Sequence, residues 1–364
     1  MNGPVELLSP RVGVLQFGTG AVGSALLQQL DAAENADIAL IGIANSRRQY
    51  AVPEESNVAI ARARLDAKGQ PRDDSLLLAA LDESNCERRA IIDATASPQV
   101  AAKHAGWLRA GYDVITANKA ATGGPLAGWQ GVREAARTAR RFYGDSATVG
   151  AGLPVLSTLR RLRGAGDRLV ALEGVFSGSL SWLFNHYDGA RPFHALLAEA
   201  RAWGYTEPDP RLDLSGADVA RKLLILARAA GFALDEIDVE IENLVPPQLR
   251  CVDAQTFHAH AHELDEPLAA RLCASRNRGT VLRYLARLDA CGNASVGLCE
   301  VDASHPAARL RGCENLFALV TARYRAQPLV IQGAGAGPEI TAQAMLADLL
   351  SLHERVFAPL PLAV

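Results

Sequence analysis

The sequence predicts an α/β protein in two parts, a mostly parallel sheet flanked by helices and then a mixed α+β region. Up to about residue 150, apolar strand-like runs alternate with helical patterns, and a glycine-rich loop follows the first run. Beyond that point the pattern changes to longer helical stretches with scattered strands. Because 364 residues exceed the size of one ordinary core, at least two domains are expected.

The first part reads as strand, helix and strand in repetition. Strands are expected at 11–17, 38–44, 91–94 and 113–116, and helices at 24–31 and 99–110. Such alternation is typical of a parallel sheet, whose ligands bind beyond the carboxyl ends of the strands. The loops that follow these strands are therefore the expected places for a site.

The second part predicts a different arrangement. Strands are expected at 169–176 and 283–288, amphipathic helices between 192 and 231, and a last helix at 340–352. We therefore expect three segments, 1–150 as a nucleotide-binding domain, 151–332 as a second domain, and 333–364 returning to pack on the first.

Composition and charge indicate a cytoplasmic protein with a small-molecule partner. The formal net charge is −3, with 37 basic and 40 acidic residues interspersed, which disfavours nucleic acid and anionic membranes. The six cysteines show no CxxC spacing, and residues 1–10 have no secretory signal pattern. The apolar run 38–44 is far shorter than the roughly 20 residues that cross a bilayer.

A GxGxxG loop directly follows the first expected strand and opens a helix. Its residues are Gly18, Thr19, Gly20, Ala21, Val22 and Gly23. Gly18 would permit the turn, Gly20 would let the backbone approach a pyrophosphate, and Gly23 would allow close helix-strand contact. Glycines also serve as ordinary turn residues, but with both flanking elements present the loop favours a Rossmann-type nucleotide-binding domain.

The end of the second strand bears on the choice of cofactor. NAD-preferring sites usually place an acidic residue there to hold the ribose 2′-hydroxyl, whereas this chain has Asn45 followed by Arg47 and Arg48. Two guanidinium groups suit a 2′-phosphate, which favours NADP over NAD. The alternative is that both arginines are solvated loop charges.

The stretch 204–222 is the most informative for chemistry. Two prolines stiffen a loop with three carboxylates, and Asp218 and Lys222 follow four residues apart on one expected helix face. A lysine beside carboxylates is a proton donor and acceptor suited to an alcohol-carbonyl pair, and neighbouring acids can bind an ammonium group. The alternatives are a capping box from Ser215 to Asp218 and a surface ion pair of little energetic value.

Taken together and in order, five motifs resemble the homoserine dehydrogenase family. They are the glycine loop, TANK at 116–119, VGAGLP at 149–154, SGSLS at 177–181 and the stretch from GYTEPDP at 204–210 to ARK at 220–222. The resemblance runs from about residue 11 to the C-terminus and is strongest to the dehydrogenase part of bifunctional aspartokinase-homoserine dehydrogenases. It includes no aspartokinase or ACT module, so we expect the dehydrogenase part alone.

The resemblance implies reversible, NAD(P)H-dependent reduction of L-aspartate 4-semialdehyde to L-homoserine, a step in threonine, methionine and isoleucine biosynthesis. It implies that Lys222 is the acid-base residue and that Asp218 orients it or the substrate. Substrate-binding residues implied by the family are Glu207, Asp213, Gly178, Ser179, Tyr205 and Lys119. Further cofactor-facing residues are Thr95, Ala96, Ser97, Asn118, Lys119, Gly204, Gly335 and Gly337.

The family also implies a monovalent cation, Na⁺ or K⁺, and a homodimer formed through a mixed α+β catalytic and dimerisation domain. The backbone carbonyls of Val149, Ala151 and Leu153 are the expected cation ligands. The chain departs from its relatives nearby, with Ser146 where an acidic ligand is common. It departs again at Leu212, where many relatives have a second aspartate.

Two other functions share some of these features. Aspartate-semialdehyde dehydrogenase uses a cysteine nucleophile, but none of the six cysteines has a recognisable nucleophile setting. A catalytically inactive NADP-binding regulator is disfavoured because the acid-rich loop and its lysine are retained. The histidines at 258, 260 and 262 lie in a helical pattern that separates neighbours two apart, so a structural cluster is favoured over zinc.

Overall fold

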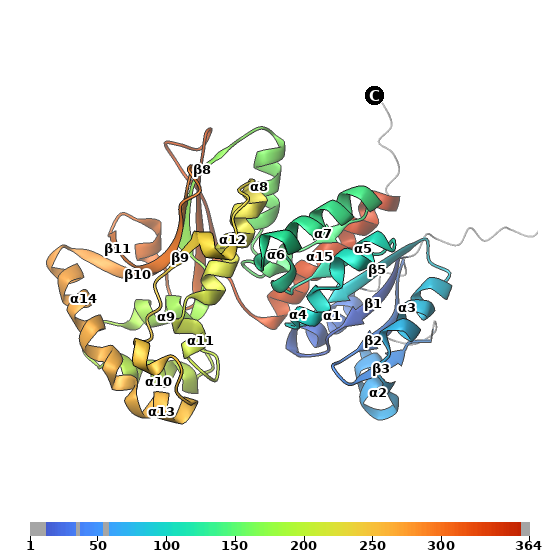
Figure 1. Ribbon diagram of the computed structural model, residues 1–364, viewed down its shortest axis with the longest axis horizontal. Helices are drawn as coiled ribbons and strands as arrows, with labels where there is room; N and C mark the ends of the chain where they lie inside the picture. The colour runs from blue at the N-terminus through green and yellow to red at the C-terminus, as the bar shows by residue number, and fades with distance from the viewer. Residues whose placement is uncertain (1–11, 34–36, 54–57, 358–364) are drawn as a thin grey trace, which may run out of the picture. The chain divides into compact units, whose positions relative to one another are not determined.

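The computed structural model describes residues 12–33, 37–53 and 58–357 (Figure 1). Arg11, the expected start of the first strand, lies outside these residues. The chain forms two compact units. Unit 1 comprises residues 1–122, 127–148 and 337–364, and unit 2 comprises residues 123–126 and 149–336.

Unit 1 is built on a seven-stranded sheet in the order β4-β3-β2-β1-β5-β6-β7. The strands are β1 (Val12–Phe17), β2 (Ile38–Ala44), β3 (Arg48–Ala51), β4 (Gln70–Pro71), β5 (Arg88–Asp93), β6 (Asp113–Thr116) and β7 (Tyr143–Gly144). The five strands from β2 to β7 in this order are parallel, and β3 and β4 add an antiparallel edge. All six residues of β1 are buried, as expected for a central parallel strand covered on both faces.

The main helices of unit 1 follow these strands. They are α1 (Ala21–Ala32), α2 (Ala61–Lys68), α3 (Asp74–Glu83), α4 (Pro98–Ala101), α5 (His104–Arg109), α7 (Leu126–Ala139) and α15 (Pro338–Phe357), with the turn α6 (Ala120–Gly123) before α7. The expected single helix at 99–110 is wrong, because a tight turn from Lys103 N to Val100 O separates α4 from α5. His104, the first residue of α5, is fully buried.

The last helix of the chain belongs to unit 1. Helix α15 packs against α1, and Ala342, Met345, Leu349 and Leu352 of α15 are buried in the same apolar cluster as Leu26 and Leu30 of α1. Segments from the two ends of the chain therefore share one core.

Unit 2 contains a six-stranded, mostly antiparallel sheet in the order β13-β12-β8-β10-β11-β9. Its strands are β8 (Leu169–Val175), β9 (Val239–Ile241), β10 (Thr280–Asp289), β11 (Ala294–Asp302), β12 (Glu314–Thr321) and β13 (Leu329–Ala334). Its helices are α8 (Val155–Gly164), α9 (Gly178–His186), α10 (Phe193–Ala202), α11 (Arg211–Leu214), α12 (Ala217–Ala230), α13 (Ala254–His260) and α14 (Asp265–Asn277). The predicted fold class, an α/β nucleotide-binding unit with a second mixed unit, is confirmed.

Helix α12 is central to unit 2. Its apolar residues Leu223, Leu224 and Leu226 are buried in the main cluster of this unit with Tyr284 of β10. Because one face is fixed in this way, the polar residues on its other faces have defined positions. Across the described residues, no helix combines the length and the apolar character needed to cross a membrane.

Candidate active site

Lys222 of α12 is held in place by two oxygen partners in unit 2. Its Nζ lies 2.9 Å from a carboxylate oxygen of Asp218, one helical turn earlier, and donates to the backbone carbonyl of Phe176 at 2.8 Å. The lysine side chain is 12% exposed, so its amine has a defined position at the surface of a packed unit. These contacts use two of the three ammonium donors and leave one to meet a ligand oxygen.

Helix α12 begins at a glycine turn. The residue before the helix is Gly216, with φ of 72°, and it has no side-chain cap. A Cβ at this glycine would lie 2.0 Å from the hydroxyl of Tyr284, so the tight approach requires glycine. Because the residue before the helix is Gly216 and the Ser215 hydroxyl accepts from the amide of Ala217, the expected capping box from Ser215 to Asp218 is not formed.

Asp213 brings a second carboxylate into this region. One of its oxygens accepts a hydrogen bond from the backbone amide of Glu207 at 2.9 Å, and the hydroxyl of Ser179 also donates to it. Burial raises the pKa of Asp213, and the Glu207 and Asp218 carboxylates raise it further, against the effect of these hydrogen bonds. Such a site is short of positive charge and favours a cationic ligand group.

Asp209, the third carboxylate of the loop, has a structural partner. Its side chain pairs with Arg211 at 2.7 Å, which lowers the pKa of Asp209. The same guanidinium also donates to the backbone carbonyl of Val252, so the pair fixes the proline-rich loop. Glu207 and Asp213 are therefore the carboxylates of this loop that remain candidates for a ligand.

The SGSLS segment forms the start of α9. Ser177 caps the helix by accepting from the amide of Leu180 at 3.2 Å, and Gly178 and Ser179 form its first turn. A Cβ at Gly178 would lie 3.2 Å from the carbonyl of Cys313. The hydrogen bond from Ser179 to the Asp213 carboxyl brings the predicted turn and the acidic loop together.

Tyr205 and Gly204 lie at the end of α10. The Tyr205 ring stacks on Trp182 with centroids 5.2 Å apart and is 39% exposed. Gly204 has φ of 74°, and the amide of Tyr205 bonds back to the carbonyl of Ala200 at 2.8 Å, which closes the helix end. The reversal of the chain at the end of α10 is enough to require a glycine at position 204, so a contact of Gly204 with a cofactor stays a prediction.

The glycine loop of unit 1 has the shape that a pyrophosphate requires. Gly18 has φ of 98°, and a Cβ at Gly23 would lie 2.1 Å from the Gly18 carbonyl oxygen. Gly20 precedes α1 with no side-chain cap, and a Cβ there would meet nothing within 4 Å. Thr19, Ala21 and Val22 complete the loop. An uncapped helix N-terminus facing open space fits an anionic phosphate group.

Arg62 lies beside this loop, a position that was not predicted from the sequence. Its guanidinium donates to the carbonyl of Thr19 and the hydroxyl of Ser24. The contact joins α2 to the start of α1 across more than 30 residues of sequence, so no local motif marks it. Arg62 adds a positive charge to the end of the helix that would receive a phosphate.

Asn45 shapes the turn after β2. Its side-chain oxygen accepts from the amides of Arg47 and Arg48 at 2.8 and 2.7 Å. The Arg48 guanidinium donates to the carbonyl of Asp66 at 2.8 Å, which connects this turn to α2. Arg48 is thus attached to α2, the helix that carries Arg62.

The predicted residues after β5 and β6 come together in one polar cluster. The amide nitrogen of the Asn118 side chain donates to the carbonyl of Ser97 at 2.9 Å and approaches the Thr95 hydroxyl at 3.4 Å. Ser97 in turn caps α4. Ala96 lies between the two loop residues, and Lys119 directly follows Asn118. These positions are at the carboxyl ends of parallel strands, where such sheets bind ligands.

The predicted cation ligands lie in a turn, and the predicted cofactor-facing Gly335 lies in a packed position. Val149 and Ala151 flank Gly150 in a turn where Ala151 has φ of 51°, while the Leu153 carbonyl accepts the amide of Val155 at 2.8 Å. A Cβ at Gly335 would overlap the Asn315 side chain at 2.1 Å, so packing explains that glycine.

Gly337 and Ser146 both lie next to α15 in sequence or in space. Gly337, with φ of 130°, precedes α15. Ser146 bonds to Asp348 of α15 through its amide and its hydroxyl, at 2.9 and 2.8 Å. In the described part of the chain, no three His, Cys, Asp or Glu side chains are grouped so as to hold a metal ion.

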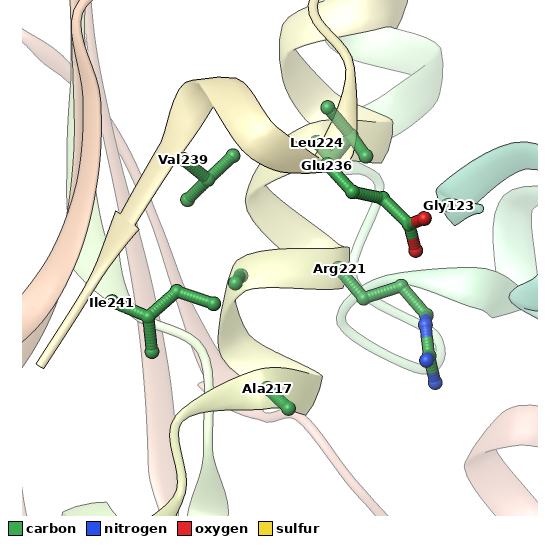
Figure 2. A pocket seen from close by; sticks show the side chains of 8 residues that line it. Gly123, Ala217, Arg221, Leu224, Glu236, Val239 and Ile241 are labelled. Atoms are coloured by element: carbon green, nitrogen blue, oxygen red, sulfur yellow. The ribbon is translucent and has the colours of Figure 1, made fainter. Parts of the chain in front are cut away.

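A cavity of unit 2 lies on another face of α12 from Lys222 (Figure 2). Its volume is about 120 Å³, and it is lined by Arg221, Glu236 and apolar residues that include Leu224 and Ile241. Figure 2 shows the Arg221 side chain beside this cavity. Lys222 is not among the residues that line it, so neighbouring positions of α12 serve separate regions.

Comparison with known proteins covers both units. Residues 154–350 match the family described as homoserine dehydrogenase, and residues 18–143 match the homoserine dehydrogenase NAD-binding domain. The chain is 39% identical over 358 residues to bifunctional aspartokinase/homoserine dehydrogenase 2 of Zea mays, covering 96% of the chain and 39% of that protein. The chain thus spans about two fifths of the length of such bifunctional relatives.

Two further relatives match along nearly their whole length. Homoserine dehydrogenase of Emericella nidulans is 36% identical over 378 residues, covering 98% of the chain and 100% of that protein. A Candida auris crystal structure of unknown function is 32% identical with a TM-score of 0.89, covering 96% of this chain and 99% of that one. With both domain matches in the expected order, the chain belongs to the homoserine dehydrogenase family, whose first domain binds a nicotinamide dinucleotide.

Proposed function

We propose that this chain is a homoserine dehydrogenase that interconverts L-aspartate 4-semialdehyde and L-homoserine with NADPH or NADP. The observation that carries the proposal is the Lys222 amine, fixed between Asp218 and the Phe176 carbonyl in the unit that also holds Asp213. The test is an absorbance assay of purified protein with homoserine and each oxidised cofactor. Homoserine-dependent cofactor reduction supports the proposal, and its absence in folded protein that binds NADPH refutes it.

The acidic loop supports an amino-acid substrate. Glu207 and Asp213 carry two carboxylates, and the raised pKa of Asp213 reflects burial without enough positive charge nearby. The α-ammonium group of the substrate supplies that charge, and the Ser179 turn orients it. Lys119 of unit 1 is a further proposed substrate contact, because it follows a strand end.

Lys222 provides the proton in this scheme. The nicotinamide cofactor, when bound, would donate the hydride in reduction and accept it in oxidation. In reduction, the Lys222 ammonium donates its third proton to the developing alkoxide oxygen, while Asp218 and the Phe176 carbonyl hold the amine. In oxidation, the same amine accepts the proton of the substrate hydroxyl as the hydride leaves for the nicotinamide.

Three arginines support NADP as the preferred cofactor. Arg47 and Arg48 follow Asn45 at the end of β2, and Arg62 is anchored at the start of α1. A 2′-phosphate carries negative charge that such guanidiniums bind, whereas NAD offers a neutral hydroxyl. A higher kcat/KM with NAD than with NADP would overturn this preference.

Substituting Gly20 with alanine tests the phosphate site without disturbing the fold. A Cβ at this position meets nothing within 4 Å, so the thermal midpoint is expected to stay within about 1 °C of the wild type. The same methyl group occupies the space of the pyrophosphate, so the Kd for NADPH is expected to rise about tenfold or more. Fluorescence titration with NADPH measures it, and Gly106→Ala in α5, also in open space, is the matched control.

Substituting Asp213 with asparagine is expected to trade stability against substrate affinity. Because the folded state raises the pKa of this carboxyl above 3.8, the ionised group costs stability at pH 7, and the cost fades as pH falls toward 3.8. Asp213→Asn should therefore raise the thermal midpoint by about 1–3 °C at pH 7 and less in acid, while KM for homoserine rises about tenfold or more. An unchanged KM would contradict the substrate role.

The thioester chemistry of aspartate-semialdehyde dehydrogenase has little support here. Burial raises the pKa of Cys299 and of Cys313, which disfavours a thiolate nucleophile at either position. All six cysteines are unpaired in the described structure, which suits a reducing compartment such as the cytoplasm. Direct labelling of an active-site thiol that abolished activity would revive the rival reaction.

We further propose that the chain forms a homodimer through unit 2 and that the Val149–Leu153 turn binds a monovalent cation. Exposed apolar side chains of unit 2 support the dimer, with Ile237 92% exposed and Ile241 44% exposed. Sedimentation tests the dimer. Activity assays in Na⁺, K⁺ and a bulky organic cation test the ion.

A further inference from the structure

Asp93 is a fully buried carboxylate at the point where β5 ends and the candidate cofactor loop begins. One of its oxygens accepts from the backbone amide and the hydroxyl of Thr95, at 2.9 and 2.6 Å. The other lies 2.9 Å from the side-chain nitrogen of Asn118 and 2.9 Å from Nε2 of His104. One carboxylate thus joins two loops and a helix.

The contact with His104 extends this network away from the loops. Nδ1 of the same ring lies 2.9 Å from the hydroxyl of Tyr143 in β7, and the ring stacks on Trp107 with centroids 5.6 Å apart. With Nε2 donating to the Asp93 carboxylate, the imidazole has a fixed orientation. Because the His104 side chain is 0% exposed, it has no access to a substrate and is not a proton carrier in the reaction.

We infer that Asp93 and His104 are positioning residues for the nicotinamide cofactor, an inference that rests on the proposed function. The carboxylate holds Thr95 and Asn118 in their bound geometry before the cofactor arrives. Loops ordered in advance do not lose conformational freedom on binding, so affinity is gained without a new contact. Burying a charged group normally destabilises the folded state. A buried carboxylate with four hydrogen-bond donors around it, however, holds the residues that carry them in a single arrangement.

Asp93→Asn tests this role. An amide cannot accept from all four donors, so the two loops lose their common anchor. We expect the Kd for NADPH, measured by fluorescence titration, and KM for NADP to rise about tenfold. In contrast, kcat at saturating cofactor should stay within about threefold and KM for homoserine within about twofold of the wild type, since neither Asp93 nor His104 contacts the reacting atoms.

Asp113→Asn is the matched control. Asp113 is also fully buried in the same sheet, but it begins β6 and thus lies at the opposite end from the loops. It lies 2.8 Å from the Arg88 guanidinium and accepts from the amide of Phe142 at 2.7 Å. Because burial raises the pKa of this carboxyl, the ionised group costs stability at pH 7, so the substitution is expected to keep or raise the thermal midpoint, with no change in NADPH affinity. Equal increases of Kd in the two variants would overturn the inference.

A second pair of variants decides the matter if Asp93→Asn does not fold. His104→Gln keeps a donor for the carboxylate, whereas His104→Leu removes it. A raised Kd for NADPH in the leucine variant and a smaller change in the glutamine variant support the inference, while wild-type Kd in both refutes it. Because Kd is measured without turnover, a protein that binds NADPH but does not oxidise homoserine would refute the proposed function alone.

Discussion

Replacing Lys222 with alanine is expected to lower kcat for homoserine oxidation about 10³-fold, the typical contribution of a positioned acid-base group. The loss follows from removing the amine that Asp218 and the Phe176 carbonyl hold in place. Cofactor affinity should change little, because the glycine loop belongs to the other unit. Steady-state kinetics with NADP and a separate NADPH titration measure the two effects.

Arg221→Ala provides the control for this substitution. Arg221 precedes the lysine in α12, but its side chain lines the separate cavity near Glu236 (Figure 2). Its removal is expected to leave kcat within about threefold of the wild type. Near-normal turnover in a folded Lys222→Ala variant would refute the proposed role. Equal losses in both variants would point to damage of the helix as a whole.

Gly23→Ala is expected to abolish useful cofactor binding and to destabilise unit 1. A Cβ at this position would lie 2.1 Å from the Gly18 carbonyl oxygen and 2.9 Å from the side-chain nitrogen of Gln16, so the backbone of the loop must move. Overpacking of this kind costs about 1–3 kcal/mol or more. We expect NADPH affinity to fall about 100-fold, and the thermal midpoint of unit 1 to fall by about 5 °C.

Calorimetry and fluorescence titration test this prediction, with Gly131→Ala in α7 for comparison. A Cβ at Gly131 meets nothing within 4 Å, and alanine favours a helix interior. That variant should be as stable as the wild type or slightly more stable. A Gly23→Ala protein with wild-type NADPH affinity would show that the close contact does not shape the cofactor site.

The central elements of the fold could be predicted because burial leaves a strong pattern in the sequence. The strands at 38–44 and 113–116 were expected with the bounds that the structure shows, since both are short apolar runs. The edge strands β3 and β4 could not be predicted, because they are only four and two residues long and carry no apolar pattern. The break between α4 and α5 is one tight turn at Lys103, which the periodicity of the sequence does not reveal.

For the candidate site, too, some contacts could be predicted from the sequence and others could not. The spacing of Asp218 and Lys222 predicted a pair on one helix face, and the structure places the two charged groups 2.9 Å apart. The contact of Arg62 with the glycine loop could not be predicted, because it arises from packing between α2 and α1. The roles of the site residues themselves stay predictions until the variants are measured.

The position of α15 has a consequence for biogenesis. During synthesis on a ribosome, the strands of unit 1 emerge long before the helix that completes their core, and the continuous stretch 149–336 emerges in between. Until α15 is made, the apolar residues of unit 1 that pack against Met345 and Leu349 stay exposed. Unit 2 can fold as soon as the stretch 149–336 has left the exit tunnel. Nascent chains of this protein should therefore gain protease resistance in the middle of the sequence before they gain it at the beginning.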